Sequence, residues 1–330
     1  MVADQTFAQA PAPARTKPFR IDVHHHYFPP QMLEAQVNAR ADGLSPGVKA
    51  WQVQKSIEVM DQGGVATAIV STSSGLELRQ SLDEQGMRTL ARTCNEFAAR
   101  MAADHKGRFG FFTFLPMPDV EGSLKEIAYA FDTLKADGVG FMTSYGEQWP
   151  GDEAFVPVLQ ELNRRKATIF VHPLAPFCCT NLQPGIANQI VEYPYDSGRA
   201  ILSLLFNGRF VQFRDIQWIF CHAGGPIPML AGRIENSSRN AKTLAQFAPQ
   251  GVQAEFQRLH YETANSAYAP TMAALQKFVP ASQILFGTDF PYIQVADNVD
   301  RLQKLEIPAE TLAAIERGNA AKLFPRARNA

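Results

Sequence analysis

Histidines in this sequence stand directly after short apolar runs. His24 and His26 follow the run Phe19–Val23. Side chains two residues apart on a strand lie on the same face, so two imidazoles at this spacing can bind one metal ion. The same alternation places Asp22 on their face and His25 on the other. We therefore predict a metal site at the end of this first strand.

Three later apolar runs end in a similar way. His172 and His222 each follow a run directly, and Asp289 follows another after one threonine. Three imidazoles and one carboxylate suit a borderline divalent cation, Zn²⁺ first and Mn²⁺ as the alternative, with a position open for water or substrate. One histidine is then left over. His222 precedes a glycine pair and is the natural candidate for a general acid or base.

Eight apolar runs alternate with amphipathic helical patterns from residue 19 onward, which predicts a (β/α)₈ TIM barrel with elaborated βα loops. The carboxyl ends of its strands meet at one mouth, so the four ligands and His222 would converge there. A doubly wound sheet is the alternative, but no GxGxxG turn follows the first strand. The predicted strands are Phe19–Val23, Ala66–Ser71, Phe109–Leu115, Gly138–Thr143, Ala167–Val171, Ile216–Cys221, Leu259–Thr263 and Ile284–Gly287.

Composition limits the partners and the domain organisation. The 330 residues carry 31 Lys and Arg against 32 Asp and Glu, and a charge this balanced argues against a nucleic-acid partner. No run of about 18 apolar residues predicts a membrane span. Residues 1–18 are rich in Ala and Pro and are expected to be a disordered lead-in, with one domain over 19–330. A cytoplasmic location is expected, and a trimmed exported form is the alternative. The four cysteines fit buried free thiols better than a disulfide framework.

Six motifs in this order resemble the amidohydrolase superfamily. The resemblance is strongest to its branch of 2-amino-3-carboxymuconate-6-semialdehyde decarboxylase and related non-oxidative arenecarboxylate decarboxylases, and it covers nearly the whole chain after about residue 19. The motifs are Ile21–His26 (IDVHHH), Met60–Gly64 (MDQGG), Val171–Pro173 (VHP), His222–Arg233 (HAGGPIPMLAGR), Leu285–Pro291 (LFGTDFP) and Gly318–Phe324 (GNAAKLF).

The resemblance implies a barrel with one divalent metal and a catalytic role for His222. It also implies that Arg233 reaches from a neighbouring subunit to the carboxylate of the substrate, which suggests a homodimer. A lysine that could bridge two metals is missing from the fourth strand, Gly138–Thr143, so the site is expected to be mononuclear. The residues that match the metal ligands of the family are His24, His26, His172 and Asp289.

The substrate expected from the sequence is a small aromatic acid. The aminocarboxymuconate enzymes carry another arginine between the first strand and the Met-Asp helix, where this shorter region offers Lys49 and Lys55. This departure favours a monocarboxylic phenol such as a salicylate, methylsalicylate or resorcylate over a muconate diacid. Aromatic residues expected near the rim, where they could contact the ring, are Phe28, Phe177, Tyr195, Phe290 and Tyr292.

The hypothesis for the reaction is metal-dependent loss of CO₂ from a 2-hydroxyarenecarboxylate. Asp289 is the candidate acid that protonates the carboxyl-bearing carbon, His222 assists at the phenolic oxygen or relays the proton, and Arg233 orients the carboxylate. The alternative is a hydrolase that uses a metal-activated water against a lactone, ester or amide. A catalytically inactive barrel that serves as a scaffold ranks last, because every expected ligand position is filled.

Overall fold

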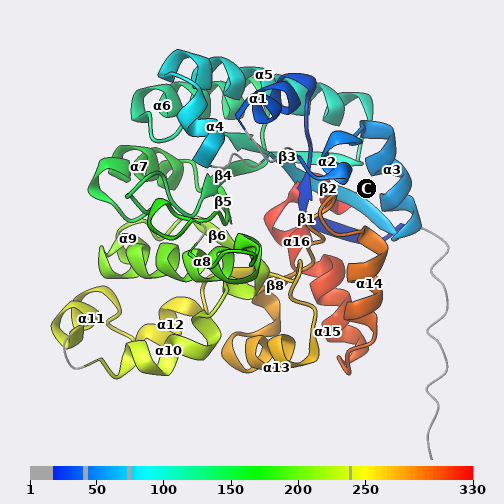
Figure 1. Ribbon diagram of the computed structural model, residues 1–330. Helices are drawn as coiled ribbons and strands as arrows, with labels where there is room; N and C mark the ends of the chain where they lie inside the picture. Colours follow the sequence, from blue (N-terminus) through cyan, green and yellow to red (C-terminus); the bar gives the residue numbers. More distant parts are fainter. Residues whose placement is uncertain (1–17, 40–43, 73–75, 181, 238–239, 330) are drawn as a thin grey trace, which may run out of the picture.

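The computed structural model describes residues 18–39, 44–72, 76–180, 182–237 and 240–329. Eight parallel strands pair in chain order from β1 to β8, and helices surround them (Figure 1). The predicted (β/α)₈ barrel is therefore confirmed. The strands are β1 Arg20–His26, β2 Val65–Ser71, β3 Phe109–Phe114, β4 Gly138–Met142, β5 Thr168–His172, β6 Gln217–Phe220, β7 His260–Glu262 and β8 Ile284–Leu285.

Backbone hydrogen bonds between the last strand segment and β1 close the barrel. Val23 N donates to Phe286 O at 3.0 Å, and His26 N donates to Phe290 O at 2.7 Å. In an open sheet, the backbone amide and carbonyl groups of the two edge strands would have no partners, and closure of the barrel pairs them. The closure also brings the segment after β8 against the histidine-rich end of β1.

The connections between strands are helical, and several loops carry extra short helices. The α-helices are α1 Pro30–Ala39, α2 Pro46–Lys49, α3 Val53–Gln62, α4 Leu76–Ser81, α5 Glu84–Asp104, α6 Val120–Tyr129, α7 Val156–Arg164, α8 Asn188–Phe206, α9 Arg209–Gln212, α10 Ile227–Glu235, α11 Ala241–Phe247, α12 Val252–Phe256, α13 Ala269–Phe278, α14 Val295–Gln303, α15 Ala309–Ala313 and α16 Ala320–Leu323. The 3₁₀ turns used below are η3 Phe177–Cys179 and η4 His222–Gly224.

Helix α5 illustrates how local sequence sets the outer layer. Its N-cap Asp83 accepts a hydrogen bond from Gly86 N at 2.7 Å, which satisfies a free amide of the first turn. The stripe that contains Leu90, Cys94 and Met101 is buried, as its helical spacing predicts. The helix thereby packs its apolar face against the barrel and leaves its polar face outward.

Three further expectations concern the cysteines, the N-terminal segment and membrane-spanning helices. Cys94 and Cys221 are buried free thiols as predicted, but Cys178 is exposed and Cys179 is half-buried, so that part of the prediction is wrong. The expected lead-in over 1–18 lies almost wholly outside the described residues. Within the described residues, no helix combines the length and apolar character needed to cross a bilayer.

Candidate active site

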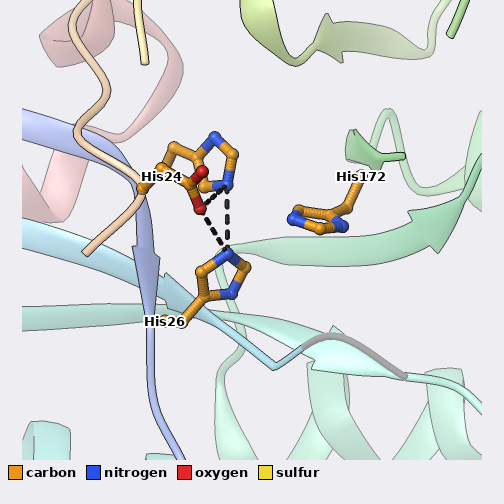
Figure 2. Close-up of side chains that lie close together, drawn as sticks. His24, His26 and His172 are labelled. Atoms are coloured by element: carbon orange, nitrogen blue, oxygen red, sulfur yellow. Dashed lines mark hydrogen bonds and ion pairs between the residues drawn. The ribbon is translucent and has the colours of Figure 1, made fainter. Parts of the chain in front are cut away.

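Four side chains from β1, β5 and the segment after β8 converge at the carboxyl end of the barrel. His24 Nε2 lies 3.1 Å from His26 Nε2, and Asp289 Oδ1 lies 3.2 Å from the first nitrogen and 3.0 Å from the second. His172 faces this pair from another strand (Figure 2). One ligand atom from each of the four residues lies within 4.8 Å of the other three. The sequence placed these residues at strand ends, and the fold brings them together.

Hydrogen bonds on the far side of two rings fix which nitrogen faces the centre. His24 Nδ1 lies 3.0 Å from Glu262 Oε1, which also accepts a hydrogen bond from His222 N at 2.7 Å. His26 Nδ1 lies 3.3 Å from the carbonyl oxygen of Ser71. Carboxylate and carbonyl oxygens only accept, so each Nδ1 holds its proton and each Nε2 is the nitrogen that can bind a cation when it carries no proton. Two facing lone pairs beside a carboxylate form a centre built for a cation.

The donor set fits a divalent metal. Two nitrogens bound about 2.1 Å from one ion, at angles between about 90° and 109°, lie about 3.0–3.4 Å apart. The separation of 3.1 Å between the two Nε2 atoms falls within that range. His172 Nδ1 is buried with no hydrogen-bond partner among the described residues. Three imidazoles and one carboxylate therefore converge as a candidate site for one ion, and their roles as ligands stay a prediction.

The electrostatics of the centre also favour a cation. Burial lowers the pKa of His172 well below its usual value, aided by neighbouring His26 and His24, and burial lowers the pKa of His26 as well. Both rings are thus neutral ligands near pH 7. Burial works to raise the pKa of Asp289, but His24 and hydrogen bonds from His222 and other rings hold it well below its usual range. An ionised carboxylate beside neutral imidazoles attracts positive charge.

His24 is the exception among the three rings. Burial lowers its pKa, but Cys221, Asp289 and Glu262 together outweigh burial and raise the pKa of His24 well above its usual value. The two carboxylates therefore attract a cation to this position. A bound metal would take the place of that proton.

A strained turn after β6 places His222 over the centre. His222 has a φ of 53° and Ala223 a φ of 57°, both in the left-handed region. Gly225 follows at a φ of 61°, and a Cβ there would lie 2.1 Å from Pro194 O. Only glycine fits this position. The glycine pair seen in the sequence thus lets the chain turn so that His222 Nε2 lies 3.5 Å from Asp289 Oδ2.

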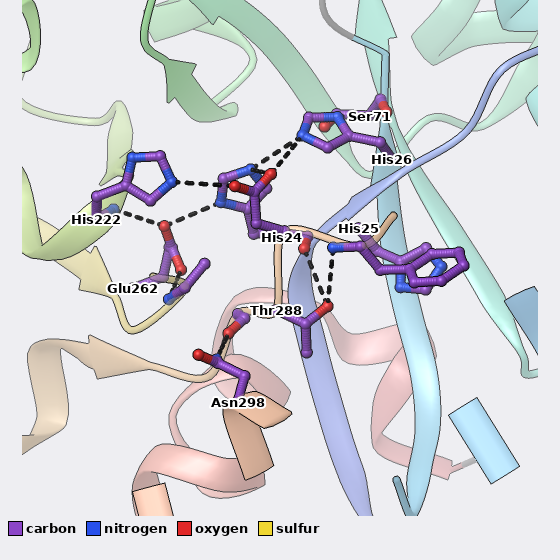
Figure 3. A network of polar contacts seen from close by, with 12 residues as sticks. His24, His25, His26, Ser71, His222, Glu262, Thr288 and Asn298 are labelled. Carbon is purple, nitrogen blue, oxygen red and sulfur yellow. Dashed lines mark hydrogen bonds and ion pairs between the residues drawn. The ribbon is translucent and has the colours of Figure 1, made fainter. Parts of the chain in front are cut away.

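Two carboxylates outside the group of His24, His26, His172 and Asp289 hold the centre together, and one of them, Glu262, forms a second candidate metal-binding group with His24 and His222. Glu262 at the end of β7 joins the His24 ring to the His222 backbone, as Figure 3 shows. Asp22 accepts hydrogen bonds from His24 N and Thr288 N, both at 3.0 Å, and from Thr288 Oγ1 at 2.6 Å. These contacts tie β1 to the turn that carries Asp289. Sequence reasoning did not single out Glu262, although a carboxylate at a strand end was the available signal.

The prediction that Asp22 and His25 lie on opposite faces is wrong. Their pairing register with β2 shifts between these two residues, so strict alternation is lost. His25 Nδ1 lies 3.1 Å from Asp22 Oδ2, and His25 Nε2 lies 3.1 Å from Ser56 Oγ. Trp51 Nε1 donates to the same hydroxyl at 3.1 Å. His25 therefore links the centre to the segment that contains α3.

The residues predicted to bind substrate fall into different surroundings. The rings of Phe28 and Tyr292 lie 6.2 Å and 5.4 Å from that of His26, so both stand beside the centre. Phe290 instead packs against His25 at 4.8 Å. Arg233 on α10 is exposed and takes part in none of the ion pairs that join described residues. The expectation that the region between β1 and α3 offers Lys49 and Lys55 in place of an arginine is wrong, because Arg40 stands in this region. Arg40 lies outside the described residues.

A closed parallel barrel with a His₃Asp centre at its carboxyl end defines a metal-dependent enzyme of the amidohydrolase type. The sequence model described as Amidohydrolase matches residues 21–326. A 6-methylsalicylic acid decarboxylase from Penicillium expansum is 33% identical over 315 residues, covering 93% of this chain and 96% of that protein. The chain belongs to the amidohydrolase family, in the branch that contains the 2-amino-3-carboxymuconate-6-semialdehyde and hydroxyarene-acid decarboxylases.

Solved structures share the fold at lower identity. A 2,6-dihydroxybenzoate decarboxylase complexed with 2,6-dihydroxybenzoate aligns with a TM-score of 0.83 at 19% identity, over 93% of this chain and 99% of that one. A dihydroxybenzoic acid decarboxylase from Polaromonas, with bound manganese and 2-nitroresorcinol, aligns with a TM-score of 0.79 at 20% identity, over 93% and 97% of the two chains. These alignments support the barrel assignment independently of the sequence match.

Proposed function

We propose that this enzyme is a metal-dependent non-oxidative decarboxylase, a carbon–carbon lyase that releases CO₂ from a hydroxyarenecarboxylate. The observation that carries the proposal is the His₃Asp centre with His222 beside it, in a chain one-third identical to a 6-methylsalicylic acid decarboxylase over nearly its whole length. The substrate class is a salicylate, methylsalicylate or resorcylate. It is supported by the names of this relative and of the resorcylate decarboxylases that also match.

One divalent ion per subunit would be held by the four converging side chains, His24, His26, His172 and Asp289. When bound, such an ion acts as a Lewis acid for the substrate oxygens that gain negative charge. The three imidazoles make Zn²⁺ the first candidate. Mn²⁺ is the competing candidate, because structural neighbours carry manganese. Metal analysis of the purified protein decides between the two.

Asp289 and His222 carry the proton in this proposal. Asp289 delivers a proton to the carboxyl-bearing carbon, the bond to the carboxylate breaks, and its electron pair restores the aromatic ring as CO₂ leaves. His222 Nε2, 3.5 Å from Asp289 Oδ2, returns a proton to that carboxylate for the next turnover. Because the pKa of Asp289 is held well below its usual range, this carboxylate is ionised before substrate binds, and His222 supplies the proton that Asp289 passes to carbon.

Substrate binding combines aromatic walls and a cation from a second subunit. Phe28 and Tyr292 stand beside His26 and contact the ring, while Phe290 supports the site from the His25 side. Arg233 is exposed in the single chain and would reach the carboxylate of a substrate bound to the other subunit of a homodimer. Size determination in solution tests the dimer. Arg233→Ala is expected to raise KM while the metal content stays at the wild-type level.

A paired assay separates decarboxylation from hydrolysis. Purified enzyme of known metal content is given substituted salicylates and resorcylates, and CO₂ release is followed. In parallel, aryl lactones, esters and amides are tested for acid release. Release of CO₂ without hydrolysis supports the proposal. Acid release alone would assign the hydrolase alternative, and no activity in either arm with full metal occupancy would favour a scaffold.

A further inference from the structure

An enclosed arginine near the active-site mouth has no anionic partner among the residues that the structure describes. Arg79 lies on α4, directly after β2, and its guanidinium carbon stands 4.8 Å from the centre of the Tyr145 ring and 6.0 Å from that of Phe114. Its Nη1 donates to Met117 O, whereas its Nε is buried without a hydrogen-bond partner. Arg79 forms no ion pair with any residue that the structure describes. Burial lowers the pKa of its guanidinium, which means that the site disfavours a lone cation.

Other enclosed arginines of this protein are paired. Arg20 Nη2 lies 2.5 Å from Glu316 Oε1, and Arg209 Nη2 lies 2.5 Å from Glu153 Oε2. An unpaired charge of this kind costs free energy unless something compensates it. The contrast suggests that the partner of Arg79 is a bound molecule.

A cavity of about 380 Å³ opens beside this guanidinium. Pro118, Tyr145 and Phe177 line it together with Arg79, and they come from the segments after β3, β4 and β5. The cavity therefore lies at the same end of the barrel as the metal ligands. Glu147 is the carboxylate among the lining residues, and it is exposed and forms no ion pair with Arg79. The size is sufficient for a small aromatic molecule.

The cavity is adjacent to the strand that carries a metal ligand. Tyr145 OH accepts a hydrogen bond from Met142 N, and Met142 pairs with His172 across β4 and β5. None of the metal ligands lines the cavity. It is therefore a neighbouring compartment of the mouth and is separate from the centre itself.

We propose that this cavity is a capture site for the aromatic carboxylate substrate, with the guanidinium of Arg79 bound to the carboxylate and the rings of Tyr145 and Phe177 around the aromatic ring. The inference rests on the proposed function for the identity of the acid. A guanidinium fork matches a carboxylate in shape and charge. The aromatic walls select a ring over a small inorganic anion such as bicarbonate. From this site the acid reaches the metal centre across the mouth of the barrel.

The test measures binding of benzoate, which carries the carboxylate but no ortho hydroxyl. Calorimetry on metal-loaded wild type, Arg79→Gln and Arg100→Gln gives the affinities. Arg100 is an exposed arginine on α5 outside the cavity, so it controls for the loss of one positive charge. Arg79→Gln is expected to weaken benzoate binding on the order of 10- to 100-fold, as for loss of a charged hydrogen bond. Arg100→Gln should match the wild type. Bicarbonate should bind to wild type at least about 10-fold more weakly than benzoate.

Thermal unfolding separates binding from a structural role. Removal of an unpaired enclosed cation should leave the Tm of the ligand-free protein unchanged or higher, and should abolish most of the Tm increase that benzoate gives. A lower Tm without ligand, combined with an unchanged benzoate response, would mean that Arg79 only supports the fold and would overturn the proposal. Bicarbonate binding as tight as benzoate binding would overturn the aromatic assignment.

Kinetics with a hydroxyarenecarboxylate keep this inference distinct from the proposed function. A capture site predicts that Arg79→Gln raises KM with little change in kcat. If no decarboxylation occurs but Arg79→Gln still loses benzoate binding, the proposed function fails and the carboxylate site stands. If the enzyme decarboxylates and Arg79→Gln changes neither KM nor benzoate affinity, the capture site is refuted while the proposed function stands.

Discussion

The two halves of the barrel interior are built from the same strands and have opposite character. Toward the carboxyl ends lie the ionisable groups of the metal centre. Below them lies a compact apolar cluster, in which Phe112 stacks on Phe170 at 5.0 Å and meets Phe324 edge-on at 5.7 Å. Phe170 forms the boundary, because its ring also contacts His24 at 5.0 Å. The cluster consists of Ile21, Val23, Ile69, Phe112, Phe170, Ile219, Cys221, Leu285, Ala320, Phe324 and Ala327.

The difference shows how one strand can serve stability and chemistry in turn. In β1, Ile21 and Val23 enter the apolar cluster, and His24 and His26 enter the metal centre. Left-handed non-glycine residues occur after β6, β7 and β8, at His222, Ala223, Asn265 and Asp289, and also before β4 and β5, at Lys135 and Lys166. Four of these six described residues therefore lie at the end that carries the ionisable groups, where the surrounding structure must enforce their strain.

The largest expected effect lies at the polar end. Asp289→Asn removes the proposed proton carrier and one anionic ligand, and should lower the rate of CO₂ release about 10²- to 10⁴-fold. Circular dichroism should show an intact barrel, because the apolar cluster is untouched. Initial rates are normalised to metal content measured on the same sample. Decarboxylation at near wild-type rate would reject the role of Asp289.

A matched substitution at the apolar end should lower stability and leave activity close to wild type. Phe112 is 1% exposed, and Phe112→Ala is expected to lower the free energy of unfolding by about 3–5 kcal/mol. Metal content and kcat per folded molecule should stay close to wild type. Urea unfolding measures the stability, and Phe112→Leu, which keeps more of the volume, should lose less. Loss of metal before any loss of stability would show that the two halves are not separable.

Substitution of Glu262 tests whether a residue that orients His24 and the His222 turn contributes to metal affinity and activity. Glu262→Gln weakens the contacts that orient His24 and the His222 turn, so metal affinity or activity should fall about 10- to 100-fold. Glu255→Gln is the control, since Glu255 is a buried carboxylate paired with Arg214 away from the centre. It should reduce stability without changing metal affinity. Competition with a chelator measures the affinity of each variant.

The smallest effect concerns a histidine that is outside the centre. His260 begins β7, and burial lowers its pKa to about 4, partly offset by a hydrogen bond to the backbone of Trp218. The unfolded chain, with a histidine pKa of about 6.5, binds the proton more readily, so stability falls as the pH drops from about 6.5 toward 4. Between pH 7 and pH 5, the free energy of unfolding of His260→Gln should therefore fall by on the order of 1–2 kcal/mol less than that of the wild type. Identical pH profiles of unfolding would contradict this assignment.

Much of the fold could be predicted from local pattern. Strand β2 was expected over Ala66–Ser71 and runs over Val65–Ser71, because an apolar run that starts just after two glycines is typical of a buried parallel strand. The boundary of β1 was harder. It was expected to end its apolar run at Val23 but continues to His26, because hydrogen bonds to the segment after β8 extend it. Such pairing depends on residues more than 250 positions away, as the contact of Asp22 with Thr288 at a separation of 266 shows.

The sequence by itself determined which candidate ligand residues follow the strands, and a parallel barrel gathers all carboxyl ends of its strands at one mouth. Tertiary structure decided the orientation of each ring and which groups lie beside each charged side chain. Glu262 contacts His24 across a separation of 238 residues, and a register shift in β1 turns His25 onto Asp22. From the sequence, Arg79 is an ordinary helix residue, and only the fold shows that it is enclosed with no carboxylate of the described residues beside it. Periodicity specifies which side of an element is buried, whereas a hydrogen bond or an unpaired charge depends on ångström-scale distances between elements that only packing sets.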